Sequence, residues 1–327
     1  MEPTENDNIE HINTAPLVKL AEQIQEQVSK VIVGQHSMTE MLLAGLLADG
    51  HILIEGVPGV AKTLAAKLIA RLIKADFSRI QFTPDLMPSD VIGTSVFNPQ
   101  STTFQFKPGP IFSNIVLIDE INRAPAKTQA ALFEVMEERQ VTVDGQTHHL
   151  QAPFMVIATQ NPIEHEGTYR LPEAQLDRFI MKITVGYPSL EEEIIILERQ
   201  NRQAILRSLD DVAAIIDPTL LKQARQMVRM VHIEPRLLEF IAKIIWETRN
   251  DRSLYIGASP RASIALLNVA KALSVLHGRN FVIPEDILQA APPVLRHRIS
   301  LTPEREMEGA TTDDVLKEIV SRIEIPR

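Results

Sequence analysis

The stretch Gly56-Val57-Pro58-Gly59-Val60-Ala61-Lys62-Thr63-Leu64 decides the fold of this chain. An apolar run at residues 51–55 precedes it, and residues 64–70 repeat apolar side chains at helical spacing. The order strand, glycine-bearing turn and helix is the context in which such a motif holds phosphate, because backbone N–H groups and the helix N-terminus attract anionic oxygens. The stretch therefore predicts a nucleotide phosphate site at the end of a strand.

Three positions of this loop carry specific expectations. Lys62 is placed to reach the β- and γ-phosphates of a nucleotide, and the Thr63 hydroxyl to bind Mg²⁺. Ala61 departs from the pattern G-x-x-x-x-G-K-[ST], which has glycine there. Because alanine strongly prefers negative φ, we expect a negative φ at Ala61.

Composition narrows the class of protein. The 327 residues are 45% apolar and 23% charged, which are values of globular domains, and length allows one large domain or two ordinary ones. With 33 basic and 42 acidic residues the net charge is −9, which argues against a dedicated duplex-DNA binder. The absence of cysteine excludes disulfides, thiol catalysis and cysteine-ligated metals. No apolar run is long enough to insert into a membrane and the N-terminus does not resemble a signal peptide, so we expect a cytoplasmic protein.

The chain divides into three parts by pattern. Residues 1–16 predict a flexible N-terminus, residues 17–188 an α/β nucleotide-binding domain and residues 189–327 an all-helical domain. In the α/β part, helices separate the strand candidates, which predicts a parallel sheet with both faces covered. The strand candidates are residues 51–55, 79–83, 115–119, 154–159 and 179–184. The main helix candidates of the third part are residues 191–201, 218–230, 235–249, 262–276 and 284–295.

Two stretches interrupt the alternation of strands and helices. Residues 93–106 alternate apolar positions around a polar Asn-Pro-Gln-Ser centre, and residues 140–150 have Asp-Gly between alternating flanks. Both patterns predict β-hairpins, and Asp-Gly is among the strongest short hairpin signals. In the helical part, we expect three aromatic side chains to pack inside the domain: Phe240, Trp246 and Tyr255.

Polar side chains follow two of the expected strands. Asp119 and Glu120 end the buried run at 115–118, and Asn161 follows the run at 154–159. Ligands of open α/β sheets bind at the carboxyl ends of strands. Asp119 is therefore expected to hold Mg²⁺, Glu120 to deprotonate the attacking water, and Asn161 to help position that water. For Asn161, ordinary turn chemistry before a proline is an equally good interpretation.

Two arginines are candidates for contact with phosphate. Arg178 directly precedes the last expected strand, and an arginine there can stabilise transferring phosphoryl charge from a neighbouring subunit. Taken alone, a surface ion pair with Asp177 or Glu173 explains Arg178 as well. Arg261 opens a helix of the third part and could contact the γ-phosphate, or be a solvated residue of the first turn.

Together these elements resemble the AAA+ ATPases and, more narrowly, the MoxR family. The motifs that carry the resemblance are residues 55–63, Pro84-Asp-Leu-Met-Pro-Ser-Asp90, Ile118-Asp-Glu-Ile-Asn-Arg-Ala-Pro125, Ala158-Thr-Gln-Asn-Pro162, Leu171-Pro-Glu-Ala-Gln-Leu-Asp-Arg-Phe179 and Ser259-Pro-Arg-Ala262. The resemblance covers about residues 17–327. It implies a P-loop parallel sheet covered by helices, two hairpin insertions, a C-terminal helical lid domain, and ATP hydrolysis with Mg²⁺.

The resemblance also implies roles for single residues. Lys62 and Thr63 match Walker A, and Asp119 and Glu120 match Walker B, with Thr63 and Asp119 at the metal. Asn161 matches sensor 1, Arg178 the arginine finger and Arg261 sensor 2. The segment around Val33 and Gly34 resembles the one that packs on adenine, and Arg123 and Arg170 are further candidates for the subunit interface.

Several functions fit such an ATPase. The resemblance favours a chaperone-like remodeller that forms a homo-oligomeric ring, expected to have six copies, and acts on partners with a von Willebrand factor A domain. A magnesium-chelatase-like motor is the alternative. A helicase-like motor is disfavoured because the hairpin at 140–150 has no Lys or Arg and the hairpin at 93–106 has only Lys107 near its end, so we expect no nucleic-acid partner. A small-molecule phosphotransferase is disfavoured by the two arginines.

Overall fold

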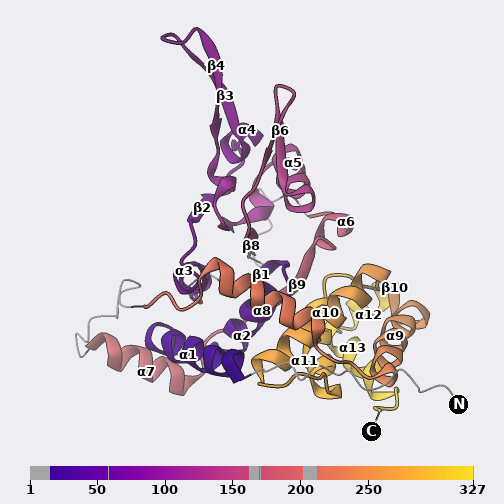
Figure 1. Cartoon of the computed structure of the whole chain (residues 1–327). Helices are drawn as coiled ribbons and strands as arrows, with labels where there is room; N and C mark the ends of the chain where they lie inside the picture. Colours follow the sequence, from indigo (N-terminus) through magenta and orange to yellow (C-terminus); the bar gives the residue numbers. More distant parts are fainter. Residues whose placement is uncertain (1–14, 58, 162–168, 170, 202–211, 327) are drawn as a thin grey trace, which may run out of the picture.

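Five parallel strands form one sheet at the centre of the molecule (Figure 1). This computed structural model describes residues 15–57, 59–161, 169, 171–201 and 212–326. The sheet consists of β1 (His51–Gly56), β2 (Phe77–Gln81), β5 (Ile115–Asp119), β8 (Met155–Gln160) and β9 (Phe179–Val185), in the order β2-β5-β8-β1-β9. All five strand predictions are confirmed, although β2 begins two residues before the expected strand.

Both faces of the sheet are covered, as the long apolar runs require. Every residue of β5 is buried, and successive side chains of a strand point to opposite faces. Ile115 and Leu117 face the cluster that contains α2 (His36–Leu47) and α3 (Lys62–Leu72), whereas Val116 and Ile118 face the cluster that contains α5 (Ala126–Glu138). α1 (Ala15–Val31) packs beside α2 on the first of these faces.

Two hairpins project from the sheet, as predicted (Figure 1). They are β3 (Gly93–Asn98) with β4 (Thr103–Pro108), and β6 (Gln140–Val143) with β7 (Gln146–His149). The turn of the second hairpin has positive φ at Asp144 and Gly145, 52° and 75°, as a two-residue Asp-Gly turn requires. The Phe106 ring stacks on the His148 ring at 4.1 Å, so the two hairpins contact each other. Short helices flank them: α4 (Pro88–Ile92), η1 (Pro110–Phe112) and η2 (Ile121–Arg123).

The C-terminal part is a helical domain with one small sheet. Its helices are α8 (Pro218–Met230), α9 (Pro235–Asn250), α10 (Pro260–Leu276), α11 (Pro284–Leu295), α12 (Pro303–Met307) and α13 (Thr312–Ser321). The expectation of an all-helical domain is wrong in one detail, because β10 (Leu254–Ile256) pairs antiparallel with β11 (Ser300–Leu301). Strands of two or three residues are too short to show an alternating pattern in the sequence.

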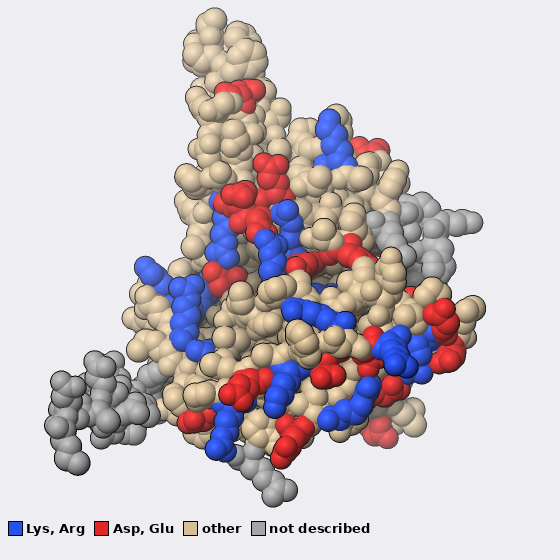
Figure 2. Space-filling model, turned by 90° about the vertical axis from the view of Figure 1, so that its right-hand side faces the viewer, with Lys and Arg blue, Asp and Glu red and all other residues tan. Residues whose placement is uncertain are grey.

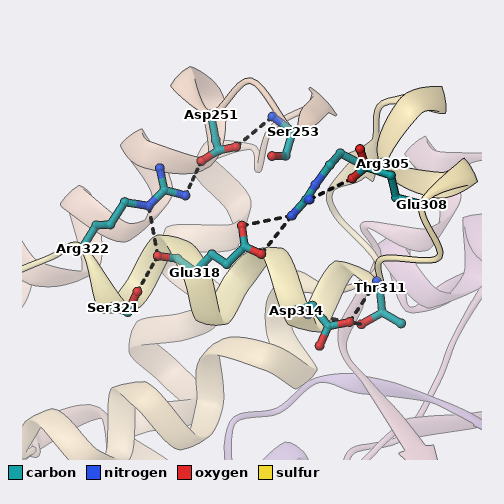
Figure 3. Close-up of polar contacts among 9 residues, drawn as sticks. All are labelled: Asp251, Ser253, Arg305, Glu308, Thr311, Asp314, Glu318, Ser321 and Arg322. Atoms are coloured by element: carbon teal, nitrogen blue, oxygen red, sulfur yellow. Dashed lines mark hydrogen bonds and ion pairs between the residues drawn. The ribbon is translucent and has the colours of Figure 1, made fainter.

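Ion pairs hold the outer helices of this domain together (Figure 3). Arg305 of α12 contacts both carboxylate oxygens of Glu318 on α13, at 2.9 and 3.0 Å. Arg322, just after α13, contacts Asp251 at the end of α9 at 2.7 Å. These contacts tie α9, α12 and α13 around the small sheet.

A buried arginine joins the helical domain to the sheet. The side chain of Arg298 is 3% exposed; it pairs with Asp177 at 2.6 Å and donates to the carbonyls of Phe179 and Ile180. Next to it, the His297 ring contacts the Phe179 carbonyl at 3.0 Å, and burial lowers the pKa of His297 well below its usual value. The start of β9 is thereby fixed to the segment that follows α11.

The aromatic residues of the helical domain differ from the expectation. Phe240 is buried as predicted, but Trp246 and Tyr255 are 61% and 77% exposed. On α9 the buried positions include Ile244, Ile245 and Thr248, so the helical period turns Trp246 outward. Burial of these two side chains within the domain was therefore a wrong prediction.

Some expectations fall on parts of the chain that the structure does not describe. The flexible N-terminus predicted for residues 1–16 lies outside the described residues up to position 14, while residues 15 and 16 belong to α1. Pro58 and Arg170 also lie outside them. Among the helices that are described, none has the length and apolar character needed to span a membrane.

Candidate nucleotide site

The predicted phosphate and metal residues meet at one edge of the sheet. β8 lies between β5 and β1, with Glu55 opposite Gln160 and Ile118 opposite Ala158. Since the strands are parallel, the carboxyl ends of β1, β5 and β8 share this edge. The phosphate loop, the pair Asp119-Glu120 and Asn161 follow these three ends directly.

The phosphate loop depends on its glycines and on one strained alanine. A Cβ on Gly56 would lie 2.7 Å from the Val185 carbonyl, and Gly59 has a φ of +86°. Ala61 has a φ of 60° and a ψ of 19°, so the expected negative φ is wrong. The chain must turn in the left-handed region immediately before α3 begins at Lys62, and alanine does so at a cost of roughly 1–2 kcal/mol.

The Lys62 side chain reaches back across the phosphate loop to the end of β1. Its Nζ donates to the Gly56 carbonyl at 2.6 Å, which places the ammonium over the turn. Thr63 and Leu64 follow in the first turn of α3, where backbone N–H groups have no helical acceptor. The loop therefore offers a cation, a hydroxyl and the N–H groups of the first helical turn to an anion.

The Asp119 carboxylate is buried and already faces a cation. It is 7% exposed; one oxygen accepts from Arg79 Nε at 2.6 Å and the other from the Thr159 hydroxyl at 3.1 Å. A buried carboxylate needs such partners, and carboxylate and hydroxyl oxygens are also the ligands that Mg²⁺ prefers. Asp119 and Thr63 thus fit the metal role by chemistry and by strand order. Within the described part of the chain, no group of three or more His, Cys, Asp or Glu side chains is arranged to hold a metal by itself.

Two neighbouring side chains hold Glu120. Its backbone lies in the left-handed region, with φ 57° and ψ 53°, which is a strained conformation typical of functional sites. Its Oε2 accepts from Gln81 Nε2 and from Arg123 Nε, both at 2.9 Å. Arg123, expected at a subunit interface, contacts the candidate base of its own chain. Gln81 was missed by the sequence interpretation, because only the strand order shows that it stands beside Asp119.

The segment expected to contact adenine lies near the same edge. Gly34, with φ 67°, follows Val33 between α1 and α2, and Gln35 Nε2 donates to the Gly186 carbonyl at 3.3 Å, just beyond the end of β9. A Cβ on Gly34 would come within 2.1 Å of the Glu192 carboxylate of α7 (Leu190–Asn201). The segment is therefore enclosed by the chain that leads out of the sheet.

Arg178 and Arg261 lie together, away from the phosphate loop. Arg178 donates to the Phe133 carbonyl and is 3.9 Å from Glu137, while Arg261 Nη2 is 3.2 Å from the same Glu137 carboxylate. The alternative partner Asp177 is instead engaged by Arg298 and by the Ser259 hydroxyl. α6 (Glu173–Leu176) and Arg178 come just before Phe179, which pairs with His51 at the first residue of β1.

This position puts the two arginines at the opposite edge of the sheet. The six residues of β1 rise about 17 Å between His51 and Gly56. Lys62 is at the far end of that rise. The strand order thus puts Lys62, Asp119, Glu120 and Asn161 at one edge of the sheet, while Arg178 and Arg261 meet at Glu137.

These features define an AAA+ ATPase: a phosphate loop after β1, an acidic pair at the end of β5, an amide after β8, and a helical lid domain. The family described as "ATPase family associated with various cellular activities (AAA)" matches residues 51–181, and the AAA lid domain matches residues 247–319. The chain is 48% identical to the uncharacterized protein YeaC of Bacillus subtilis, over 92% of this chain and 93% of that one. It is 43% identical to the chaperone MoxR1 of Mycobacterium tuberculosis, over 92% of this chain and 81% of that one. The chain belongs to the MoxR family of AAA+ ATPases.

A solved structure and a distant relative complete the comparison. A crystal structure from Cytophaga hutchinsonii, of a protein assigned as an ATPase, superposes with a TM-score of 0.88 at 41% identity, covering 96% of this chain and 97% of that one. A magnesium-chelatase subunit ChlI homolog of Methanocaldococcus jannaschii is 27% identical over 58% of this chain. The family assignment and the AAA+ fold predicted from the sequence are confirmed. Membership of this family of ATPases supports ATP hydrolysis as the activity of the chain.

Proposed function

We propose that this ATPase hydrolyses Mg²⁺-ATP at the junction between neighbouring copies of a ring, and uses the turnover to remodel or activate partner proteins. The observation that carries the proposal is the position of Arg178 and Arg261, which share Glu137 at the edge of the sheet opposite the phosphate loop. A distance of about 17 Å along β1 is too long for either side chain to reach the nucleotide of its own chain.

Each residue of the site has a defined task in this reaction. The loop from Gly56 to Leu64 binds the phosphates, with Lys62 on the β- and γ-oxygens, and Val33 and Gly34 contact the base. Thr63 and Asp119 would hold Mg²⁺, which supplies positive charge at the phosphates when bound. Glu120 orients and deprotonates the attacking water, and Asn161 positions it.

The arginines complete the site from the next copy. Arg178 neutralises charge that develops on the transferring phosphoryl group, as an arginine supplied in trans does in other phosphoryl-transfer enzymes. Arg261 belongs to the lid, so its contact with the nucleotide of the neighbour connects the lid to the nucleotide state. A closed ring, with six copies as the expectation, places one such junction at every nucleotide.

The output we favour is action on protein, with a von Willebrand factor A domain protein as the expected partner class. The hairpin β3–β4 carries no charged residue from position 91 to 106, and its projecting surface is almost uncharged (Figure 2). The hairpin β6–β7 carries Asp144, His148 and His149 but no lysine or arginine. Neither surface is suited to phosphate backbones. The relative MoxR1 bears the name chaperone, which supports the same direction, and the magnesium-chelatase alternative has only a distant relative in its favour.

Two measurements test this output. We expect Glu120→Gln protein, loaded with ATP, to retain a protein partner that ADP releases. We also expect single- and double-stranded DNA to leave the ATPase rate unchanged at physiological salt. Strong stimulation by DNA that falls steeply as salt rises would replace this proposal with a helicase-like function.

A further inference from the structure

Helix α7 presents its apolar side to solvent and its polar side to the protein. Leu190, Ile194 and Leu197 stand at positions i, i+4 and i+7, which is one stripe of a helix, and they are 71%, 47% and 63% exposed. No residue of α7 is buried, and its glutamates Glu191, Glu193 and Glu198 are exposed beside the stripe. Ile195 and Ile196 flank it and are exposed as well.

The inner side of α7 is made of polar contacts. Glu192 accepts from the Ser189 backbone N–H at 2.9 Å and lies against Gly34. Seven residues after Glu192, and so on the same side of the helix, Arg199 donates to the Ser29 carbonyl at 3.3 Å. This contact attaches α7 to α1. A surface helix normally buries its apolar stripe against its own domain. An exposed stripe such as that of α7 is typical of a surface that another molecule covers.

α7 stands on the flank of the molecule that carries the nucleotide. Through Glu192 it lies on the segment expected to contact adenine, and Figure 1 shows α7 beside α1, on the opposite side of the molecule from α9 and β10. The arginines Arg178 and Arg261 belong to the side of α9 and β10, since Arg261 opens α10 and α10 packs on α9. A copy that delivers these arginines to the nucleotide of its neighbour therefore turns its helical lid toward the α7 of that neighbour.

The side of the helical domain formed by α9, β10 and the start of α10 also exposes apolar side chains, which could cover the stripe of α7. Trp246 on α9, Tyr255 on β10 and Ile264 on α10 are exposed apolar side chains on three elements, with α9 packed against both of the others. Ile264 lies one helical turn after Arg261 and therefore on the same face of α10. The same two helices carry exposed charges of both signs, Glu247 and Arg249 on α9 and Arg261 on α10. α7 carries Glu191, Glu192, Glu193 and Glu198 against one arginine, so Arg249 and Arg261 of the lid give its glutamates cationic partners.

We propose that the stripe Leu190, Ile194 and Leu197 of one copy packs on the exposed lid surface of Trp246, Tyr255 and Ile264 of the next copy. The contact is head-to-tail, because the two surfaces differ, and repetition with closure gives a ring. It places α7, which touches the adenine segment of its own chain, under the lid that carries Arg261 of the neighbour. This inference rests on the proposed hydrolysis between copies and assigns the residues that hold those copies together.

Substitutions on the two surfaces test the proposal in the full-length protein. Ile194→Glu and Leu197→Glu place a charge in the stripe, whereas Ile195→Glu makes the same change on the same helix about 100° away from Ile194 and outside the stripe. With ATP and Mg²⁺, we expect sedimentation to show the two stripe variants as smaller species than the wild type and the Ile195→Glu control as unchanged. Their ATPase rate should fall at least tenfold, while their affinity for ADP stays within about twofold of wild type.

A mixture distinguishes this interface from damage to one chain. Ile264→Glu protein has an intact α7 and an altered lid, and Leu197→Glu protein has the reverse, so a mixed pair regains one complete junction. We expect the mixture to recover activity that neither variant has. Stripe variants that assemble and turn over like the wild type overturn the inference, as does a loss of ADP affinity without a change in size. In either case the proposed function still stands if Lys62→Ala and Arg178→Ala proteins restore activity to each other, and it fails independently if they do not.

Discussion

Arg178 and Arg261 meet at one carboxylate, that of Glu137, although one precedes the last strand of the sheet and the other opens a helix of the lid. The neighbouring Asp177 adds a second connection between the same two parts, because it pairs with Arg298 and accepts from the Ser259 hydroxyl. A displacement of the lid therefore moves Arg261 relative to Arg178 only if these contacts change. In the proposed ring, the two arginines would respond together to the nucleotide of a neighbouring copy.

Arg261→Ala should separate partner binding from nucleotide state. The variant should keep its ATP affinity and an intact α/β domain, because Arg261 is exposed and holds no buried contact of the sheet. Capture of the partner should no longer differ between ATP and ADP, measured by pull-down with each nucleotide. Arg252→Ala, another exposed arginine of the lid, is the matched control. Capture that still follows the nucleotide in Arg261→Ala would show that this residue only fixes the lid.

Lys62 and Glu120 should fail at different steps. Lys62→Ala removes the cation over the phosphate loop and should weaken ATP binding. Glu120→Gln keeps the shape of the side chain but removes the base, so ATP should bind normally and turnover should fall by about 10²–10⁴. Titration with a fluorescent nucleotide and a phosphate-release assay separate the two. Normal ATP affinity in Lys62→Ala combined with lost affinity in Glu120→Gln would reverse the assignment.

The left-handed alanine of the phosphate loop predicts an unusual substitution. Ala61→Gly removes a strain of roughly 1–2 kcal/mol and adds backbone entropy to the unfolded chain, which costs about 0.4–1 kcal/mol. The free energy of unfolding should therefore rise by about 0–1.6 kcal/mol, with nucleotide affinity retained. Ala61→Val, which puts a β-branched side chain at positive φ, should lower it by about 1 kcal/mol or more. Urea unfolding measures both, and a clear destabilisation in Ala61→Gly contradicts the φ of 60°.

His51 predicts a loss of stability at mildly acidic pH. Burial lowers the pKa of His51 to about 4, although the contact between its Nε2 and the Met136 carbonyl acts in the opposite direction. Its Nδ1 accepts from the Val156 N–H at 2.9 Å, which requires the neutral ring. Because the folded pKa lies below the unfolded value of 6.5, the contribution is complete above pH 6.5 and is lost as the pH falls from 6.5 toward 4.

The expected loss between pH 7.5 and pH 5 is about 2 kcal/mol. His51→Asn keeps an acceptor for Val156 but has no group that titrates there. The variant should be less stable than the wild type at pH 7.5 and should lose less on going to pH 5, as followed by urea unfolding at both values. An equal loss in both proteins assigns the effect to other groups, of which the buried His297 has a pKa shifted in the same direction.

The sequence predicted the elements of the fold because their patterns are local. Four consecutive apolar residues before Asp119 predict a strand, and Asp144-Gly145 predicts a hairpin, without reference to the rest of the chain. The small sheet β10–β11 escaped prediction because its strands are too short to show a period. The φ of Ala61 was predicted wrongly because the preference of alanine is weaker than the demand of the turn before α3.

The partners of the site residues depend on contacts between distant segments. Gln81 and Arg79 reach Glu120 and Asp119 only because β2 lies beside β5, and the sequence does not state the strand order. Glu137 could not be assigned to Arg178 and Arg261 for the same reason, since three separate segments meet there. The exposure of Trp246 could be read from the buried positions of α9, once the face toward the core is known.

The most direct test of hydrolysis between copies is the ATPase rate of a mixture of Lys62→Ala and Arg178→Ala proteins. Each variant alone should be nearly inactive, since an arginine finger contributes roughly 10³–10⁵ in rate and Lys62 is needed for ATP binding. In the mixture, an Arg178→Ala copy binds ATP and a Lys62→Ala neighbour supplies an intact Arg178, so activity should return well above the sum of the two. A mixture that stays as inactive as its components, although sedimentation shows that the two proteins assemble together, would contradict the account.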